Sequence, residues 1–221
     1  RQMCIRDRQK PVYYRFIDFT SQEFLQLEGG KEYEKPEENP ILGYRGGLRY
    51  MSNISSFDIE LSAIAQLKEE GYDNLHIMIP FLRSVDELVL LKKHLAQYDL
   101  IQSKKLELWM MVDVPAVALG IDRFLEQGVD GVAIGAKDLI SLFTGIVPSD
   151  NTAFTTSYFD QPAVQQLMQH IVKTCQNFSR PVIFCEHQLN QKMIEFLLSI
   201  HVDGISVNRK QVQYVKALIE R

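Results

Sequence analysis

The chain has 221 residues, of which 46% are hydrophobic and 24% charged, values that fit one ordinary globular domain. With 24 basic and 28 acidic residues it lacks the positive excess that binding to a phosphate backbone requires, so nucleic acid is not an expected partner. No apolar stretch approaches the ~20 residues of a membrane span, and the chain starts without a signal-peptide core. We therefore expect a cytoplasmic domain with no membrane partner.

From residue 11 onward, apolar runs alternate with segments of helical period, a pattern that predicts parallel strands joined by helices. Strands are expected at 12–19, 74–81, 106–114, 131–135, 181–186 and 204–208. Amphipathic helices are expected at 57–70, 84–97, 115–127, 161–177, 189–200 and 209–220. The fold class is α/β.

Local signals refine these elements. The first predicted helix has Ile59, Ile64 and Leu67 on one side. Ser84 followed by Glu87 predicts a capping box at the start of the second. Residues 28–50 are rich in Gly, Pro and charge, which predicts a loop.

Residues 1–10 show no apolar period and are expected to be a non-native or disordered start, so the predicted domain spans 11–221. A closed β/α barrel needs eight strands, and six are predicted. Either the chain lacks its first one or two β/α units, or the sheet stays open.

Two aspartates follow consecutive predicted strands, Asp113 after "MMV" and Asp138 after "AIGAK". Neighbouring parallel strands lie about 4.8 Å apart, so the two carboxylates could converge on a hard cation, which prefers oxygen ligands. A helix cap or loop residue is the commoner role for a single Asp in such a position. The spacing makes a metal site plausible.

Three arginines lie where a guanidinium needs a partner or solvent. Arg15 is in a predicted strand and Arg45 in the Gly-rich "GYRGGLRY", so both favour an anionic ligand or a salt bridge to Asp18 or a loop carboxylate. Arg83, after "MIPFL", also fits a solvated charge at a helix start.

The three cysteines form no C-x-x-C pair, which argues against a disulfide framework or a zinc site. Cys175 falls inside a predicted helix and is expected in the core. Cys185 ends a predicted strand, where a reactive thiol and a buried inert one both remain open.

Seven stretches, in this order, resemble the phosphoenolpyruvate-binding barrel at the C-terminus of phosphoenolpyruvate synthase (pyruvate, water dikinase). More distant similarity is to pyruvate phosphate dikinase and to enzyme I of the sugar phosphotransferase system. The stretches are "PVYYRFIDFTSQEF", "EENPILGYRGGLRY", "HIMIPFLRS", "MMVDVP", "AIGAKDL", "VIFCEH" and "DGISVN". The resemblance implies a (β/α)8 TIM barrel of the phosphoenolpyruvate/pyruvate type, here lacking its first one or two β/α units.

The resemblance also implies roles for particular residues. Arg15 and Arg45, with Arg83, would bind the phosphoryl group and carboxylate of phosphoenolpyruvate. Asp113 and Asp138 would hold Mg²⁺, and Cys185 would exchange a proton with the methylene carbon of the pyruvate enolate. The further substrate-binding residues are Gly135, Ala136 and Lys137, whose backbone would approach the ligand.

In that family a swivelling phosphohistidine domain carries the phosphoryl group from an ATP-grasp domain, and ATP acts only through these domains. The full-length reaction converts ATP, pyruvate and water to AMP, phosphoenolpyruvate and phosphate, a step of gluconeogenesis. The 221-residue chain alone is not expected to complete it. A homodimer is a further possible partnership.

Five residues depart from the family pattern near the implied metal site and the implied acid Cys185. Asp113 replaces the usual glutamate, and Ala136 and Lys137 replace a hydroxyl and an amide. Lys137 could pair with the two aspartates in place of magnesium. Pro148 stands where an arginine is usual and Glu186 where a glycine is usual.

Three hypotheses follow from these departures. The first is an active phosphoenolpyruvate synthase fragment. The second is a degenerate member of the family that serves as a binding or dimerisation module. The third is a metal-dependent pyruvate-enolate aldolase or lyase.

Overall fold

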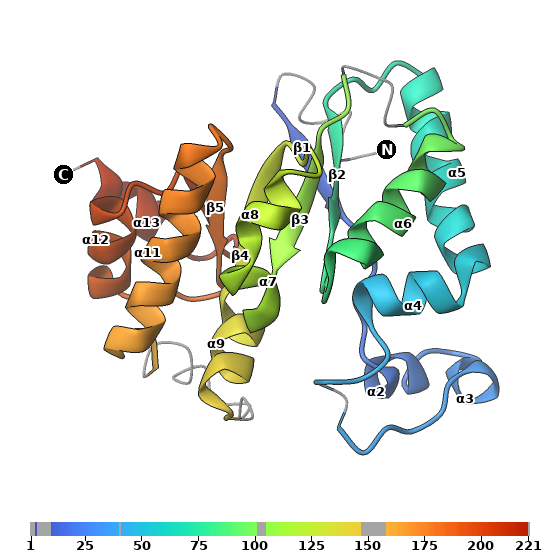
Figure 1. Ribbon diagram of the computed structural model, residues 1–221, viewed down its shortest axis with the longest axis horizontal. Coiled ribbons are helices and arrows are strands. Elements are labelled where there is room, and N and C mark those ends of the chain that lie inside the picture. The colour runs from blue at the N-terminus through green and yellow to red at the C-terminus, as the bar shows by residue number, and fades with distance from the viewer. Residues whose placement is uncertain (1–2, 4–9, 40, 101–104, 147–157, 221) are drawn as a thin grey trace. The chain divides into compact units, whose positions relative to one another are not determined.

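The computed structural model describes residues 3, 10–39, 41–100, 105–146 and 158–220. The chain divides into two compact units, Arg1–Met110 and Met111–Arg221, each with its own parallel strands and helices (Figure 1).

The described residues of the first unit form two complete strands, five helices and most of a third strand. Its elements are β1 (Val12–Arg15), α2 (Ser21–Leu25), α3 (Gly30–Tyr33), α4 (Gly46–Ser52), α5 (Ile54–Glu69), β2 (Leu75–Ile79), α6 (Val85–Ala96) and the start of β3 (Leu108–Val112). The strands are parallel, with Val12 opposite Leu75 and Ile77 opposite Leu108. Helix α4 packs against α5 and α6 (Figure 1).

An aromatic cluster joins β1, α4 and α5 in this unit. The ring centroid of Phe16 lies 4.9 Å from that of Phe57 and 5.8 Å from that of Tyr50. Glu60 accepts hydrogen bonds from the hydroxyls of Tyr14 at 2.6 Å and Tyr50 at 2.5 Å. Burial, and then Glu60, raises the pKa of both tyrosines, so their hydroxyls stay protonated as donors.

The second unit contains three further strands among its described residues. Its elements are α7 (Pro115–Leu119), α8 (Ile121–Leu125), β4 (Gly131–Gly135), α9 (Ala136–Thr144), α11 (Pro162–Asn177), β5 (Val182–Cys185), α12 (Gln191–Ser199), β6 (Gly204–Ser206) and α13 (Val212–Ile219). The strands are again parallel, with Gly135 opposite Cys185 and Cys185 opposite Ser206.

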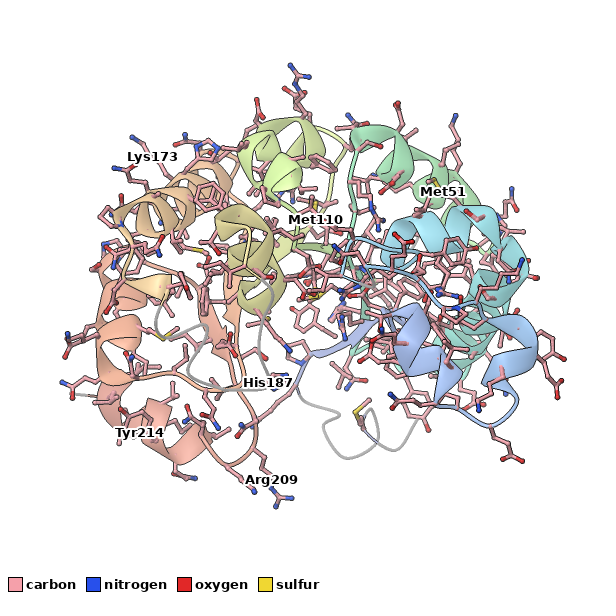
Figure 2. The ribbon with its side chains drawn as sticks, turned by 90° about the horizontal axis from the view of Figure 1, so that it is seen from below. Met51, Met110, Lys173, His187, Arg209 and Tyr214 are labelled. Atoms are coloured by element: carbon pink, nitrogen blue, oxygen red, sulfur yellow. The ribbon has the colours of Figure 1, made fainter. Side chains whose placement is uncertain are left out.

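The helices of the second unit bury apolar residues and pack against one another. Helix α11 packs against α7 and α8, and α12 against α13. Lys173 on α11 and Arg209 after β6 are exposed, and their side chains point away from the unit in Figure 2. Among the described helices, none combines the length and apolar character needed to cross a bilayer.

The α/β prediction is confirmed, since parallel strands alternate with helices in both units. All six predicted strands are present, and Gly131–Gly135 has the predicted bounds. The helix predicted at 115–127 divides into α7 and α8, because Gly120 ends the first with φ −106° and ψ 27°, outside the helical region. The missing β/α units stay a prediction.

The loop predicted at 28–50 is wrong in part, because it contains α3 and the start of α4. Gly46 adopts a φ of +57°, and a Cβ there would lie 2.5 Å from the Cβ of Phe81. The glycine that argued against a helix therefore lets α4 begin close to the end of β2. Helices α2 and α9 were also not predicted from the sequence.

The buried side of α5 differs from the predicted one. Ile59 is 74% exposed, whereas Phe57, Leu61 and Ile64 are buried. These three follow the i, i+4, i+7 spacing of one helix face, and Ile59 falls outside it. The predicted helix face is therefore wrong at Ile59.

Candidate functional site

Arg45 and Arg15 both contact Asp18, in the first unit. The Nε and Nη2 atoms of Arg45 donate to the two carboxylate oxygens of Asp18 at 3.0 and 2.6 Å. Nη1 of Arg15 donates to Asp18 Oδ2 at 3.1 Å. Arg45 is 7% and Asp18 5% exposed, whereas the Arg15 side chain is 46% exposed. Asp18 therefore binds two guanidiniums. That of Arg45 is buried, and that of Arg15, at the end of β1, faces solvent.

This ion pair is the alternative that the sequence left open beside an anionic ligand. The two readings are compatible, because a carboxylate behind a guanidinium holds its N–H fork in one direction. Arg45 also has the ring of Phe81 beneath its guanidinium, 4.1 Å from Cζ to the ring centroid. The side chain is thus held by an ion pair and a cation–π contact.

Arg83 contacts the backbone of the Gly-rich turn that carries Arg45. Its Nη2 donates to the carbonyl of Gly43 at 2.7 Å, and its Nη1 to the carbonyls of Arg45 at 3.2 Å and Phe81 at 3.4 Å. Burial lowers the pKa of the Arg83 guanidinium, and nearby Glu87 opposes that shift. Arg83 is therefore not the solvated charge that the sequence also allowed.

The predicted capping box at α6 is present in one direction only. Ser84 Oγ accepts the backbone N–H of Glu87 at 3.3 Å, as predicted. The Glu87 carboxylate, however, accepts from the backbone N–H of Arg83 at 2.6 Å, one residue before the expected position. Glu87 is 7% exposed and so ties Arg83 to the first turn of the helix.

In the second unit the Asp113 carboxylate lies directly over Gly135. Asp113 follows β3, is 3% exposed, and its Oδ1 lies 1.8 Å from where a Cβ on Gly135 would be. Across the sheet, Gly135 is paired with Cys185 at the end of β5. Gly135 therefore lies under the buried Asp113 carboxylate and opposite Cys185 in the register of β4 and β5.

Helix α9 begins immediately after Gly135 and carries the remaining predicted residues of this unit. Ala136 is buried, Lys137 is exposed, and Asp138 is half-buried in the first turn of the helix. No ion pair between Lys137 and either aspartate occurs among the described residues. The suggested pairing of Lys137 with Asp113 and Asp138 is therefore not observed among the described residues.

The described residues contain no group of three or more His, Cys, Asp or Glu side chains arranged to hold a metal. Asp113 and Asp138 remain as two carboxylates, each with interactions of its own. A magnesium site in proteins commonly uses one or two carboxylates and takes its other oxygens from substrate and water. Each carboxylate is of a type that binds Mg²⁺, and the described residues form no all-protein cage for the ion.

The two described cysteines differ in burial, and the core position predicted for Cys175 is confirmed. Cys175 is fully buried in α11, and burial raises the pKa of its thiol to about 12, which suits an inert core residue. Cys185 is partly exposed at its strand end. Glu186, after Cys185, accepts the backbone N–H of His187 at 2.6 Å. Pro148 lies outside the described residues.

Sequence reasoning gave Glu37 no role, and it gave Glu87 a role only as a capping residue of α6. Glu37 lies in the charged run "EKPEENP", where a solvated carboxylate is the ordinary reading. In the structure its Oε1 accepts the backbone N–H of Tyr44 at 2.8 Å. The only sequence signal for this contact was the density of Gly and Pro around it, which marks a built turn.

The fold and these residues define an α/β protein with cationic, acidic and thiol side chains at the carboxyl ends of parallel strands, where such folds build ligand sites. The family model "PEP-utilising enzyme, PEP-binding domain" matches residues 2–221, and the chain belongs to this family. PEP stands for phosphoenolpyruvate.

Curated relatives agree with this family. The chain is 34% identical over 215 residues to a probable phosphoenolpyruvate synthase of Methanocaldococcus jannaschii, covering 96% of this chain and 18% of the relative. It is 33% identical to phosphoenolpyruvate synthase of Helicobacter pylori, covering 92% of this chain and 26% of the relative. The chain thus spans about a quarter or less of the length of these proteins.

Solved structures show similarity of fold alone. RipC from Yersinia pestis aligns with a TM-score of 0.56 at 12% identity, covering 98% of this chain and 80% of that one. A citrate lyase from Burkholderia xenovorans aligns with a TM-score of 0.53 at 15% identity, covering 65% of this chain and 48% of that one.

Proposed function

We propose that this chain binds phosphoenolpyruvate and pyruvate as the ligand-binding domain of a phosphoenolpyruvate synthase-like phosphotransferase. The observation that carries the proposal is the family match over residues 2–221, together with relatives of that printed name over more than nine-tenths of the chain. The domain itself comprises residues 11–221 in this proposal.

Arg15 and Arg45 would bind the anionic groups of the ligand. Guanidiniums recognise phosphate and carboxylate with two parallel N–H donors, and such charge-assisted bonds are the strong ones. Asp18 supports this role because it orients Arg45 with two hydrogen bonds while Arg15 keeps an exposed side chain. A buried Arg45 loses little conformational freedom when an anion binds.

Asp113 and Asp138 would hold Mg²⁺, which when bound would stabilise negative charge on an enolate or phosphoryl oxygen. Gly135 supports this assignment, because its missing side chain leaves room for the Asp113 carboxylate. The backbone of Gly135, Ala136 and Lys137 would lie along the ligand at the start of α9.

Cys185 would supply the proton. A thiol can donate its proton to the methylene carbon of an enolate and recover it in the reverse direction. Cys185 lies on β5, opposite Gly135 of β4, and the Asp113 carboxylate lies over Gly135. Cys175 serves as the internal contrast, because it is buried in a helix core.

The full reaction would need a phosphohistidine domain and an ATP-grasp domain, and ATP would act through these. The relatives are several times longer than this chain, which is consistent with such additional domains. The likeness to a citrate lyase shows the fold alone and does not favour lyase chemistry.

A degenerate site is the second candidate, and the residues at the metal position favour it. Asp113 is one methylene shorter than the family's usual glutamate, and Lys137 brings a cation next to Asp138. A positive charge there repels a divalent ion. In this case the chain would still bind phosphoenolpyruvate through its arginines, without needing the metal.

Calorimetric titration of the chain with phosphoenolpyruvate, with and without Mg²⁺, tests the proposal. We expect saturable binding in both cases, and binding enhanced by Mg²⁺ if the metal site is intact. Absence of any phosphoenolpyruvate binding at millimolar ligand would refute the proposed function. Binding that ignores Mg²⁺ would favour the degenerate site.

Restoring the usual family residues at the metal position is expected to strengthen metal binding. We expect Asp113→Glu combined with Lys137→Asn to raise Mg²⁺ or Mn²⁺ affinity at least tenfold, about 1.4 kcal/mol. The reasons are a longer reach to the ion and the removal of a repelling ammonium. The measurement is a metal titration with phosphoenolpyruvate present at one ionic strength.

Lys173→Asn is the matched control, because Lys173 is an exposed lysine of the same unit on α11. It should leave the metal affinity unchanged. If the double variant and the original chain bind the metal equally well, other residues weaken the metal site. Tight metal binding by the original chain would reject the degenerate site.

A further inference from the structure

Residues 43–47, which we call the Arg45 turn, are held on one side by Arg83. The Arg83 guanidinium donates to the carbonyl of Gly43 at 2.7 Å and to that of Arg45 at 3.2 Å. The backbone N–H of Arg45 also donates to the Gly43 carbonyl, at 3.1 Å. One planar guanidinium therefore bridges two carbonyls of the turn, which a point-like ammonium does less well.

Glu37 holds another part of the same turn. Its Oε1 accepts the backbone N–H of Tyr44 at 2.8 Å, and a Cβ on Gly43 would lie 2.1 Å from its Oε2. The carboxylate therefore packs against the backbone at Gly43 and binds the next peptide. A cation on the turn's carbonyls and an anion on its N–H group together restrict its backbone.

Arg83 itself contacts Phe81, which follows β2, and the first turn of α6. Its backbone N–H donates to Glu87 in the first turn of α6 at 2.6 Å, and its guanidinium lies 4.8 Å from the centroid of the Phe81 ring. The guanidinium of Arg45 lies over the same ring. Through Arg83, the residues after β2 and the first turn of α6 therefore fix the position of the Arg45 backbone.

We infer that Arg83 and Glu37 are positioning residues that set anion affinity by holding the Arg45 turn. The inference rests on the proposed function of Arg45 in binding phosphoenolpyruvate. Neither residue needs to contact the ligand, because each acts on the backbone that carries Arg45. The consequence is that two side chains of opposite charge influence anion binding in the same direction.

That consequence separates positioning from simple electrostatics. If Glu37 acted only through its charge, removing it would strengthen the binding of an anion. If it holds the turn, removing it weakens binding in spite of the lost negative charge. We expect Glu37→Ala to lower the affinity for phosphoenolpyruvate about fivefold or more, measured by calorimetry on the 221-residue chain.

Glu38→Ala is the matched control for that change. Glu38 is the adjacent residue, has the same charge and is exposed. Its removal should leave affinity unchanged or raise it slightly. Opposite effects at neighbouring glutamates would not arise from long-range charge.

Arg83→Lys keeps the positive charge and loses the planar bridge between two carbonyls. We expect it to lower phosphoenolpyruvate affinity about tenfold, and to speed amide hydrogen exchange in a peptide covering residues 41–50. Arg123→Lys, at an exposed arginine of α8, should change neither quantity. The variant with both Glu37→Ala and Arg83→Lys should lose less affinity than the product of the two single losses, because either change already releases the turn.

Melting temperature is measured for each variant, so that affinity is compared only where the fold is intact. Unchanged amide exchange at 41–50, or stronger anion binding by Glu37→Ala, would overturn the inference while the proposed function stands. An original chain that binds no phosphoenolpyruvate would overturn both. Weaker binding by Glu37→Ala with unchanged binding by Glu38→Ala supports the inference.

Discussion

Replacing Arg45 by alanine is expected to abolish most phosphoenolpyruvate binding and to destabilise the first unit. The loss of a charge-assisted bidentate contact corresponds to about 2 kcal/mol or more, roughly a thirtyfold weaker affinity. Removing one member of a buried ion pair costs about 3–5 kcal/mol, because the other charge stays buried. Arg15 still contacts Asp18, so we expect a loss near the lower end.

A second variant separates the two effects. Arg45→Met combined with Asp18→Asn removes both members of the buried pair and should recover much of the stability, because no uncompensated charge remains. It should not recover ligand affinity. Calorimetry with phosphoenolpyruvate and urea unfolding provide the two measurements. Unchanged affinity in Arg45→Ala would mean that the Gly-rich turn serves structure alone.

Replacing Gly135 by alanine is expected to disrupt the second unit at the proposed metal position. The new Cβ would lie 1.8 Å from Asp113 Oδ1 and 3.2 Å from the terminal carbon of Met111. Both side chains are buried, so the carboxylate must turn away and the packing must adjust. Such overpacking costs about 1–3 kcal/mol, and displacing the carboxylate should remove any binding of Mg²⁺ that depends on it.

Gly120→Ala is the control for this change, because a Cβ there meets only the carbonyl of Ala116, at an ordinary 3.5 Å. Its stability should change by about 0.5 kcal/mol or less. Adding Asp113→Ala to Gly135→Ala should relieve the clash and restore stability but not metal binding. A fully stable Gly135→Ala protein that still binds metal would show that the carboxylate has another place to lie.

Sequence reasoning failed at two places for physical reasons. Ile59 was predicted on one side of the helix with Ile64 and Leu67, yet the face of α5 that packs is set by its neighbours and leaves Ile59 74% exposed. Residues 28–50 were predicted as a loop because they are rich in Gly, Pro and charge. The approach of Phe81 to Gly46 outweighs that local signal, and it depends on a contact between residues far apart in the chain.

The amino-acid sequence by itself determined the α/β class, the six strands and the family, because period and ordered motifs are local properties of the chain. It also placed Asp113, Asp138, Arg45 and Cys185 at or next to strand ends or turns. Only the tertiary structure decided that Asp18 holds Arg45, that Arg83 and Glu37 hold the turn, and that Gly135 leaves room for Asp113. Each of these contacts joins residues separated by 7 to 40 positions, and no local pattern encodes which charged side chain meets which backbone group.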